Sequence, residues 1–159
     1  EAQRRGWTRY VGFSSHNAPW KAAKILKEVD VDVVMLAMNV ADRHTYNFEE
    51  EVLPLAVKKN VGVAAMKVYG GTQGMKYEKP VNSALMDRGF QDHETAMRYG
   101  LGLPGVDVAV IGMFSEMELL QNIEWAQNFT PLPVEKESRI VGSSKEIAIG
   151  LGAHFGPIW

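Results

Sequence analysis

Four short polar or glycine-containing segments each follow an apolar run, and they contain the residues best suited to chemistry. They read SSHN (14–17), MNVADRH (38–44), KVYGGTQG (67–74) and GMFS (112–115). Hydroxyls, amides and closely approaching glycine backbone are groups that bind polar ligands. In parallel α/β folds, segments of this kind follow the strands, and the ligand site forms at that edge of the sheet.

Each of these side chains also has a structural explanation. Ser14 and Ser15 could satisfy backbone groups at a strand-to-helix turn or contact a ligand, and both interpretations stay open. His16 is more simply a turn residue than a catalyst. Asn39 interrupts an apolar run, and a buried amide needs hydrogen-bond partners, so its role is structural or ligand-binding. Lys67 could bind an anion or end its strand in solvent.

The segment from Gly112 onward is the more specific signal. Ser115 and Glu118 have the Ser-x-x-Glu spacing of a capping box, which predicts a helix start. Free N–H groups at such a start bind phosphate readily, although a plain capped helix explains the same residues. Gly70 and Gly71 likewise permit close approach to a ligand or a simple turn.

Composition excludes several classes of function. The 159 residues suffice for one domain with its own core, and the net charge of −2 gives no footprint for nucleic acid or acidic membranes. Without cysteine, disulfides, zinc–thiolate sites and thiol nucleophiles are excluded. No apolar run approaches the length of a membrane span. His44 and His93 lack ligand spacing with Asp or Glu, so we expect no metal site. The absence of cysteine is compatible with a reducing cytoplasm, where we expect the protein to be located.

Elements that position these segments follow from the hydrophobic pattern. Valine-rich runs without strict alternation are typical of strands covered on both faces, and periodic segments between them predict helices. Strand–helix alternation with right-handed crossovers predicts a parallel sheet, hence an α/β fold. The strands are expected at 10–13, 31–38, 61–68 and 106–112, and the helices at 18–29, 49–59, 92–101, 115–127 and about 134–149.

Three local features refine this outline. Asn17 can cap the first helix. Pro54 is tolerated in the second helix only near its first turn. Residues 70–91 form a long irregular connection, which we expect to overhang the site.

Several phrases, in the same order, resemble the C-terminal half of the aldo/keto reductase family: RYVGFSSH, EEEVLPLAVKKNVGVAAMKVYGG, RYGLGLPGVDVAVIGMFSEMELLQN and AHFGPIW. AAMKVYGG and GLPGVDVAVIGM look most like its bacterial branch. The resemblance implies a (βα)8 TIM-type barrel that reduces carbonyls with NADPH or NADH. The strands here then correspond to barrel strands five to eight, so residues 1–159 are expected to form a single half-barrel of four βα units plus a C-terminal helix.

The resemblance implies no catalytic residue in this chain. The family's Asp, Tyr, Lys and His tetrad lies on the first four βα units, and Tyr69, Lys67, Asp42 and His16 are not substitutes. We expect an oxidoreductase represented by its cofactor-binding half and inactive alone. The alternative is a non-catalytic half-barrel that acts as a binding or assembly module, and whether the chain is itself an enzyme stays open.

Cofactor contacts are implied residue by residue. Ser14 and Ser15 match the pair that hydrogen-bonds the nicotinamide carboxamide. Met35 and Met66 stand where many members place a Gln for that amide and a Tyr that stacks under the ring; methionine can pack on a ring. The remaining matches are Val68, Tyr69, Gly70 and Gly71 over the pyrophosphate, Gly112, Met113, Phe114 and Ser115 near the adenosine phosphate, and Gln121 and Asn122 at the adenine.

Charge near the adenosine phosphate bears on the choice of cofactor. Glu116 and Glu118 lie where many NADPH-binding members carry Lys or Arg for the 2′-phosphate. Two acids repel a phosphate, which favours NADH, or no cofactor, over NADPH. The expected partners are a nicotinamide dinucleotide and, once an N-terminal half completes the barrel, a small carbonyl substrate.

Half a barrel leaves two unpaired edges and an apolar inner face. Val34, Leu36, Ala65 and Ile111 are among the strand residues expected to lie uncovered there. Such surfaces invite association, so we expect self-association or pairing with a separate N-terminal half.

Overall fold

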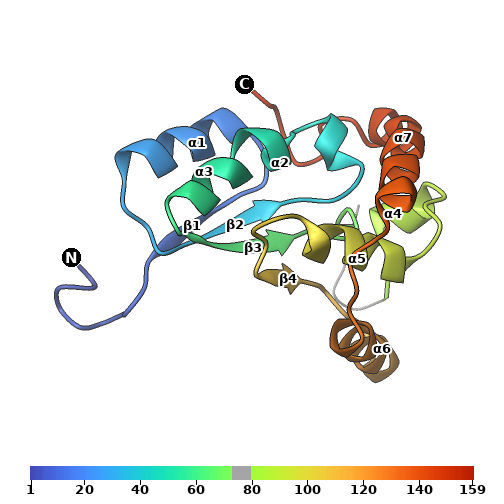
Figure 1. Ribbon diagram of the computed structural model, residues 1–159, viewed down its shortest axis with the longest axis horizontal. Helices are drawn as coiled ribbons and strands as arrows, with labels where there is room; N and C mark the ends of the chain where they lie inside the picture. The colour runs from blue at the N-terminus through green and yellow to red at the C-terminus, as the bar shows by residue number, and fades with distance from the viewer. Residues whose placement is uncertain (73–79) are drawn as a thin grey trace.

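The computed structural model describes residues 1–72 and 80–159, and its centre is a four-stranded parallel sheet (Figure 1). Neighbouring strands in the sheet are also neighbours in the sequence, and all three pairs are parallel. This order is that of consecutive βα units in a barrel, and it confirms the predicted α/β class. The strands are β1 (Gly12–Ser15), β2 (Val33–Ala37), β3 (Gly62–Met66) and β4 (Val108–Val110).

Helices follow every strand. Figure 1 shows α1, α2 and α3 together over one face of the sheet, whereas α6 stands apart from it. Among the helices of the described residues, none combines the length and the apolar character that a bilayer crossing requires. The helices are α1 (Pro19–Glu28), the short 3-10 turn η1 (Asp42–His44), α2 (Phe48–Glu51), α3 (Leu53–Lys58), α4 (Ala84–Asp87), α5 (His93–Gly102), α6 (Glu116–Gln127) and α7 (Val134–Leu151).

Two of the expected segments differ in detail. The helix predicted at 49–59 is divided at Val52, and Pro54 falls at the start of α3, where its missing N–H costs least. The connection predicted as irregular at 70–91 contains the short helix α4. Part of that connection, residues 73–79, lies outside the described residues.

The expectation that Asn17 caps α1 is wrong. The N-cap position belongs to Ala18, which has a left-handed conformation and no side-chain cap. The Asn17 amide instead donates to the backbone oxygen of Pro157, 3.1 Å away. The C-terminal residues therefore compete successfully for the side chain that the sequence pattern assigns to the helix.

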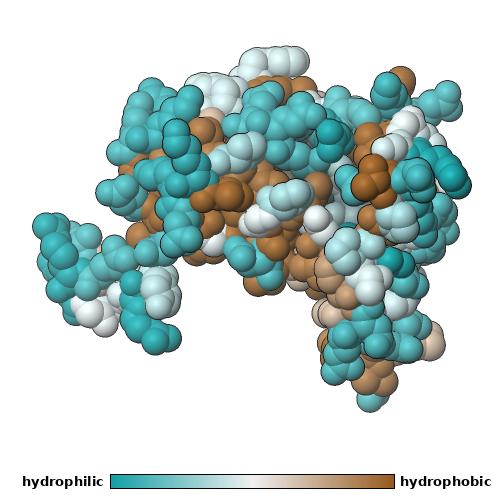
Figure 2. Space-filling view, in the orientation of Figure 1, coloured by the Kyte–Doolittle hydropathy of each residue, from teal (hydrophilic) through white to brown (hydrophobic). Residues whose placement is uncertain are grey.

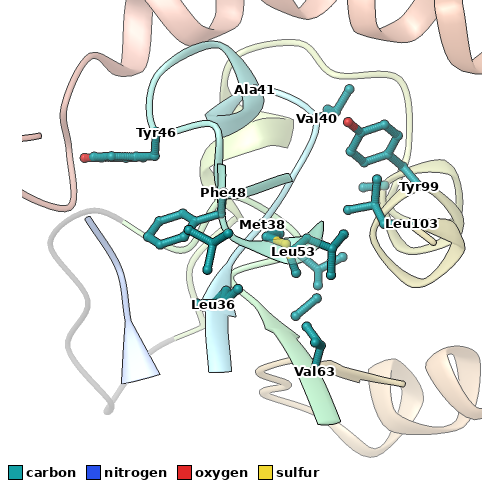
Figure 3. Packing of buried hydrophobic residues seen from close by; sticks show 14 of the residues in the cluster. Leu36, Met38, Val40, Ala41, Tyr46, Phe48, Leu53, Val63, Tyr99 and Leu103 are labelled. Carbon is teal, nitrogen blue, oxygen red and sulfur yellow. The ribbon is translucent and has the colours of Figure 1, made fainter. Parts of the chain in front are cut away.

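The core lies between one face of the sheet and the helices, as Figure 3 shows for Leu36, Phe48 and Leu53. Val34, Leu36 and Ala65 belong to this core and are fully buried, so their expected exposure is wrong. The reason is the alternation of side chains along a strand: the register aligns Val34 with Phe13 and Leu36 with Ala65, and this row points toward the helices.

The opposite face of the sheet carries the exposed row. Val33, Val108 and Val110 are 41%, 52% and 39% exposed, and no side chain of α6 is buried. Figure 2 shows hydrophobic surface across the middle of the molecule, between the N-terminal segment that precedes β1 and α6. Apolar groups in this position are covered in a closed barrel by layers of side chains from the other strands. Exposed apolar residues of α6 are Met117, Leu119, Leu120 and Ile123.

A buried polar cluster joins η1, α2 and α5. The Tyr99 hydroxyl lies 2.9 and 2.8 Å from the two carboxylate oxygens of Glu49. Arg43 donates through Nη1 to the same carboxylate at 2.7 Å. Burial raises the pKa of Glu49 to about 7, against the opposing effects of Tyr99 and Arg43. Breaking this cluster would leave a carboxylate unpaired in the interior, which is costly.

Candidate functional site

The candidate site is the edge of the sheet formed by the carboxyl ends of the strands. Two hollows of about 450 and 590 Å³ lie elsewhere. The first lies against α7 and is lined by Arg88 and Glu146, and the second is lined by Tyr10 and Asp32, near the amino ends of the strands. Neither hollow encloses the candidate residues.

Ser14 and Ser15 point to opposite faces of β1. Ser14 lies in the exposed row, beside Met35 in the register, and Ser15 faces the helices. The Ser15 hydroxyl donates to the backbone oxygen of Asn17 at 2.8 Å, which is the turn role that the sequence left open. Ser14 is thus the member of the pair whose hydroxyl faces the open side of the sheet.

Met35 and Met66 line the same open face. Met35 is partly exposed next to Ser14, whereas Met66 is only 6% exposed and lies in register with Ala37 and Val110. Together they give the carboxyl ends of β2 and β3 an apolar, polarisable floor. Their predicted contacts with a nicotinamide ring stay predictions.

Residues 68–71 turn sharply after β3. Gly70 and Gly71 have φ angles of +80° and +71°, in the left-handed region that favours glycine. A Cβ at Gly70 would lie 3.0 Å from Leu85 Cγ in α4, so a larger residue would also require Leu85 to shift. Val68 is buried in the core, which leaves its backbone as the part that could meet a ligand.

Tyr69 links this turn to α6. Its hydroxyl donates to Oδ1 of Asn122, and the Asn122 amide donates in turn to the backbone oxygen of Glu118 at 2.7 Å. The rings of Tyr69 and His93 pack in a T-shaped arrangement, with their centroids 4.6 Å apart. Burial raises the pKa of Tyr69 and lowers that of His93. Both ends of the Asn122 amide are therefore already in use; Gln121 donates to Glu124 at 3.1 Å.

The segment before α6 has the predicted cap. The Ser115 hydroxyl accepts from the backbone N–H of Glu118 at 3.2 Å. The Glu118 carboxylate accepts from the backbone N–H of Phe114 at 2.7 Å, one residue earlier than a standard capping box. A carboxylate thus occupies one of the free amides that could otherwise bind a phosphate. Gly112 and Met113 are exposed beside it.

Asn39 is a structural residue. It is fully buried, and its Oδ1 accepts from the backbone N–H groups of Ala41 and Asp42 at 3.0 and 2.9 Å. Its amide donates to the Lys67 backbone oxygen at 3.1 Å and to Asp42 Oδ2 at 2.5 Å. These bonds fasten the carboxyl end of β2 to that of β3, where Lys67 has a left-handed φ of +59°. The amide is therefore satisfied within the chain.

The C-terminal residues 152–158, called the C-terminal strap below, are the part of the site that sequence reasoning missed. Phe155 packs against Gly71, where an added Cβ would lie 3.2 Å from the ring. Lys67 Nζ lies 6.0 Å from the Phe155 ring centroid, and the centroid of the His16 ring is equally far. Burial and the charge of Lys67 lower the pKa of His16. The available signal for this contact in the sequence is Phe155, an aromatic residue within the phrase AHFGPIW.

Two histidines outside the strap, His44 and His93, make hydrogen bonds within the chain. His44 Nε2 lies 2.8 Å from the Val141 oxygen, and His93 Nε2 lies 3.1 Å from Ser83 Oγ. Within residues 1–72 and 80–159, no three His, Asp or Glu side chains gather closely enough to hold a metal ion.

Comparison with known families bears directly on this arrangement. The model of the aldo/keto reductase family matches residues 1–88, more than half of the chain. The chain belongs to the aldo/keto reductase family. This confirms the resemblance on which the site residues were predicted, while the individual contacts stay predictions.

Solved structures of the family have a similar fold. The aldo-keto reductase AKR11C1 from Bacillus halodurans superimposes with a TM-score of 0.63 and 21% sequence identity, in both its holo and apo forms. The match covers 90% of this chain but 52% and 53% of those structures, so the chain spans about half of their length. A search among curated proteins gives no match. The half-barrel architecture agrees with this partial coverage.

Proposed function

We propose that this chain is the cofactor-binding half of an NAD(P)H-dependent carbonyl reductase of the aldo/keto reductase family. Three groups of candidate residues support the proposal, because Ser14 near the end of β1, the 68–71 turn after β3 and the start of α6 after β4 all lie at the carboxyl edge of the sheet. Their shared position at this edge carries the most weight, and the hydrogen bond between Tyr69 and Asn122 holds the 68–71 turn beside α6. Ligands of parallel α/β folds bind at this edge.

The reaction would transfer a hydride from the nicotinamide to a carbonyl carbon and a proton to the carbonyl oxygen. By the resemblance, the proton donor and its partners belong to the half of the barrel that has no counterpart here. Tyr69 does not replace them, because its hydroxyl is engaged with Asn122 and burial raises its pKa. The residues of this chain would instead hold and orient the dinucleotide.

A simple assay tests this division of roles. The isolated chain should not oxidise NADH or NADPH in the presence of a small aldehyde, because positioned general acid catalysis contributes roughly 10²–10⁴-fold. Steady oxidation by protein free of contaminating reductases would contradict the proposal.

Glu118 supports NADH as the cofactor. Its carboxylate accepts from the Phe114 N–H and lies at the start of α6, where an added 2′-phosphate would meet a negative charge. Glu116 adds a second charge on the same exposed turn. In titrations of wild type and Glu118→Gln, we expect the variant to gain affinity for NADPH relative to NADH. An unchanged affinity ratio would show that Glu118 does not set the preference.

The exposed row of the sheet supports pairing with an N-terminal half-barrel of the same family. Val33, Val108 and Val110 lie exposed on this face, and the structures that resemble this chain are about twice its length. Without that half, the chain should cover the face by self-association.

Light scattering after size exclusion, at micromolar concentration, measures this association. Val108→Asp should weaken it, because a charge would enter the apolar face. Val134→Asp, at a 79% exposed position on α7, is the matched control and should not. A stable, monodisperse wild-type monomer that binds no hydrophobic dye would contradict the assignment.

One observation favours the alternative, a non-catalytic half-barrel that acts in assembly. The Tyr69 hydroxyl and the Asn122 amide are already paired within the chain, so a nucleotide must displace those bonds to use them. Association through the exposed row together with undetectable nucleotide binding would support this alternative over a cofactor-binding half.

A further inference from the structure

The C-terminal strap, residues 152–158, is docked onto loops that follow two strands. The Tyr46 hydroxyl accepts from the Phe155 N–H at 2.8 Å and donates to the Gly156 oxygen at 3.1 Å. The rings of Tyr46 and Phe155 also stack, with centroids 5.9 Å apart. One tyrosine therefore holds the middle of the strap by its hydroxyl and by its ring.

The far end of the strap is held from α1. The Asn17 amide donates to the Pro157 oxygen and the Trp20 indole donates to the Ile158 oxygen, each at 3.1 Å. These four hydrogen bonds run to a segment that lies more than 100 residues later in the chain. The strap consequently lies over the start of α1 and the loop after β2.

A buried pair of ionisable groups lies beneath the near end of the strap. Asp42 Oδ1, in η1, is 3.7 Å from Nδ1 of His154, and the two side chains are 2% and 6% exposed. Among the described residues, neither Asp42 Oδ1 nor His154 Nε2 has a hydrogen-bond partner. His154 Nδ1 also lies 3.2 Å from the Gly152 oxygen, and Asp42 Oδ2 accepts from Asn39. Buried polar atoms without partners are uncommon, so each calls for an explanation.

We propose that Asp42 and His154 form a proton-dependent clasp that holds the C-terminal strap closed over the 68–71 turn. The pair is neutral while it holds one proton and carries a buried negative charge once that proton leaves. A single proton between Asp42 Oδ1 and His154 Nδ1 would bring these atoms into hydrogen-bond distance. Because His154 belongs to the strap and Asp42 to η1, a shared proton would link the strap to the loop that follows β2.

The direction of the pH dependence follows from burial. Burial raises the pKa of Asp42 from 3.8 to about 6, while His154 and Asn39 act in the opposite direction. The closed strap therefore binds the proton more tightly than the open one, so closure is favoured at low pH and lost as pH rises through about 6. A difference of about two units corresponds to a roughly 100-fold fall in the closing equilibrium constant.

Other charged and titratable groups face this region and shape its response. Tyr46 lies beside Asp42, and burial raises its pKa. Lys67 Nζ and the His16 ring each lie 6.0 Å from the Phe155 ring centroid. Arg43 forms ion pairs with Glu49 and Glu50. The Asp42 carboxyl is thus the titratable group in direct apposition to His154.

Hydrogen exchange of the C-terminal peptide, measured by mass spectrometry from pH 4.5 to pH 8 and corrected for intrinsic rates, tests the clasp. In the wild type, protection of the strap should fall as pH rises, by up to roughly 30-fold between pH 4.5 and pH 8, because the rest of the change lies below pH 4.5. Asp42→Asn, a neutral isostere, should remove this dependence. Asp30→Asn, at a fully exposed carboxyl paired with Lys59, should retain the wild-type profile.

A second variant separates the clasp from simple docking. Tyr46→Phe should lower strap protection at every pH, because two hydrogen bonds are lost, while the pH dependence persists. Wild-type protection that does not change between pH 4.5 and pH 8 would overturn the proposal, as would an Asp42→Asn profile equal to the wild type. If Asp42→Asn does not fold, the pH dependence of strap protection in the wild type tests the proposal by itself.

Discussion

Replacing Tyr99 with Phe tests the buried cluster that joins η1, α2 and α5. Tyr99 is 2% exposed, and its hydroxyl contacts both carboxylate oxygens of Glu49 at 2.9 and 2.8 Å. A hydrogen bond to a charged group stabilises a protein by about 1.5–3 kcal/mol, and a neutral one by about 0.5–1.5 kcal/mol. The cost of Tyr99→Phe therefore depends on whether Glu49 is ionised.

The pKa of Glu49 sets the direction of that dependence. Burial raises it from 4.5 to about 7, so the folded state binds the proton more tightly and wild-type stability falls as pH rises between those values. At pH 8 Glu49 is ionised and Tyr99→Phe should cost about 2 kcal/mol, roughly a 30-fold change in the folding equilibrium. At pH 5 the carboxyl is mostly protonated and the cost should fall to about 1 kcal/mol.

Urea unfolding at 25 °C, at pH 5 and pH 8, measures both values. Tyr10→Phe is the matched control, because Tyr10 is 64% exposed, and it should change the free energy of unfolding by less than about 0.5 kcal/mol. A Tyr99→Phe cost that is equal at the two pH values, or as small as the control, would refute the assigned role of the hydroxyl.

Two further substitutions test the packing. Leu36→Ala should destabilise the fold by about 2–5 kcal/mol in urea unfolding, because Leu36 is fully buried between the sheet and the helices; a loss below about 1 kcal/mol would contradict the facing assigned to β2. Gly105→Ala should cost more than Gly6→Ala. Both have positive φ angles, of +95° and +71°, but a Cβ at Gly105 would lie 2.2 Å from Val57 Cγ2, whereas Gly6 has open space. Equal costs would show that the contact relaxes freely.

The parallel order of the strands could be predicted from the sequence, because valine-rich runs alternate with helical segments. The sequence does not predict which side chains of β2 and β3 point toward the helices. Both rows of β2 and β3 are apolar, so the pattern does not distinguish Val34 and Leu36, which are buried under α1 and α3, from Val33, which is exposed. Only the observed register resolves which row points to the helices.

Local features of the site were predicted better than distant contacts. The Ser115 cap depends on residues three positions apart, and the sequence predicted it correctly. Asn17 instead bonds Pro157, 140 positions away, and the Asp42–His154 pair spans a similar separation. Such contacts depend on how the strap crosses the sheet edge, and no local pattern encodes that path.

Calorimetric titration of NADH tests the proposed cofactor surface most directly. Wild type should bind NADH, and Gly112→Asp should weaken binding at least about tenfold, because a carboxylate would enter the surface predicted to hold the phosphates. A Cβ at Gly112 meets no described atom within 4 Å, so the fold should tolerate the change, and Gly142→Asp on α7, equally open, is the control. Absence of NADH binding by the folded wild type, or equal binding by Gly112→Asp, would contradict the account.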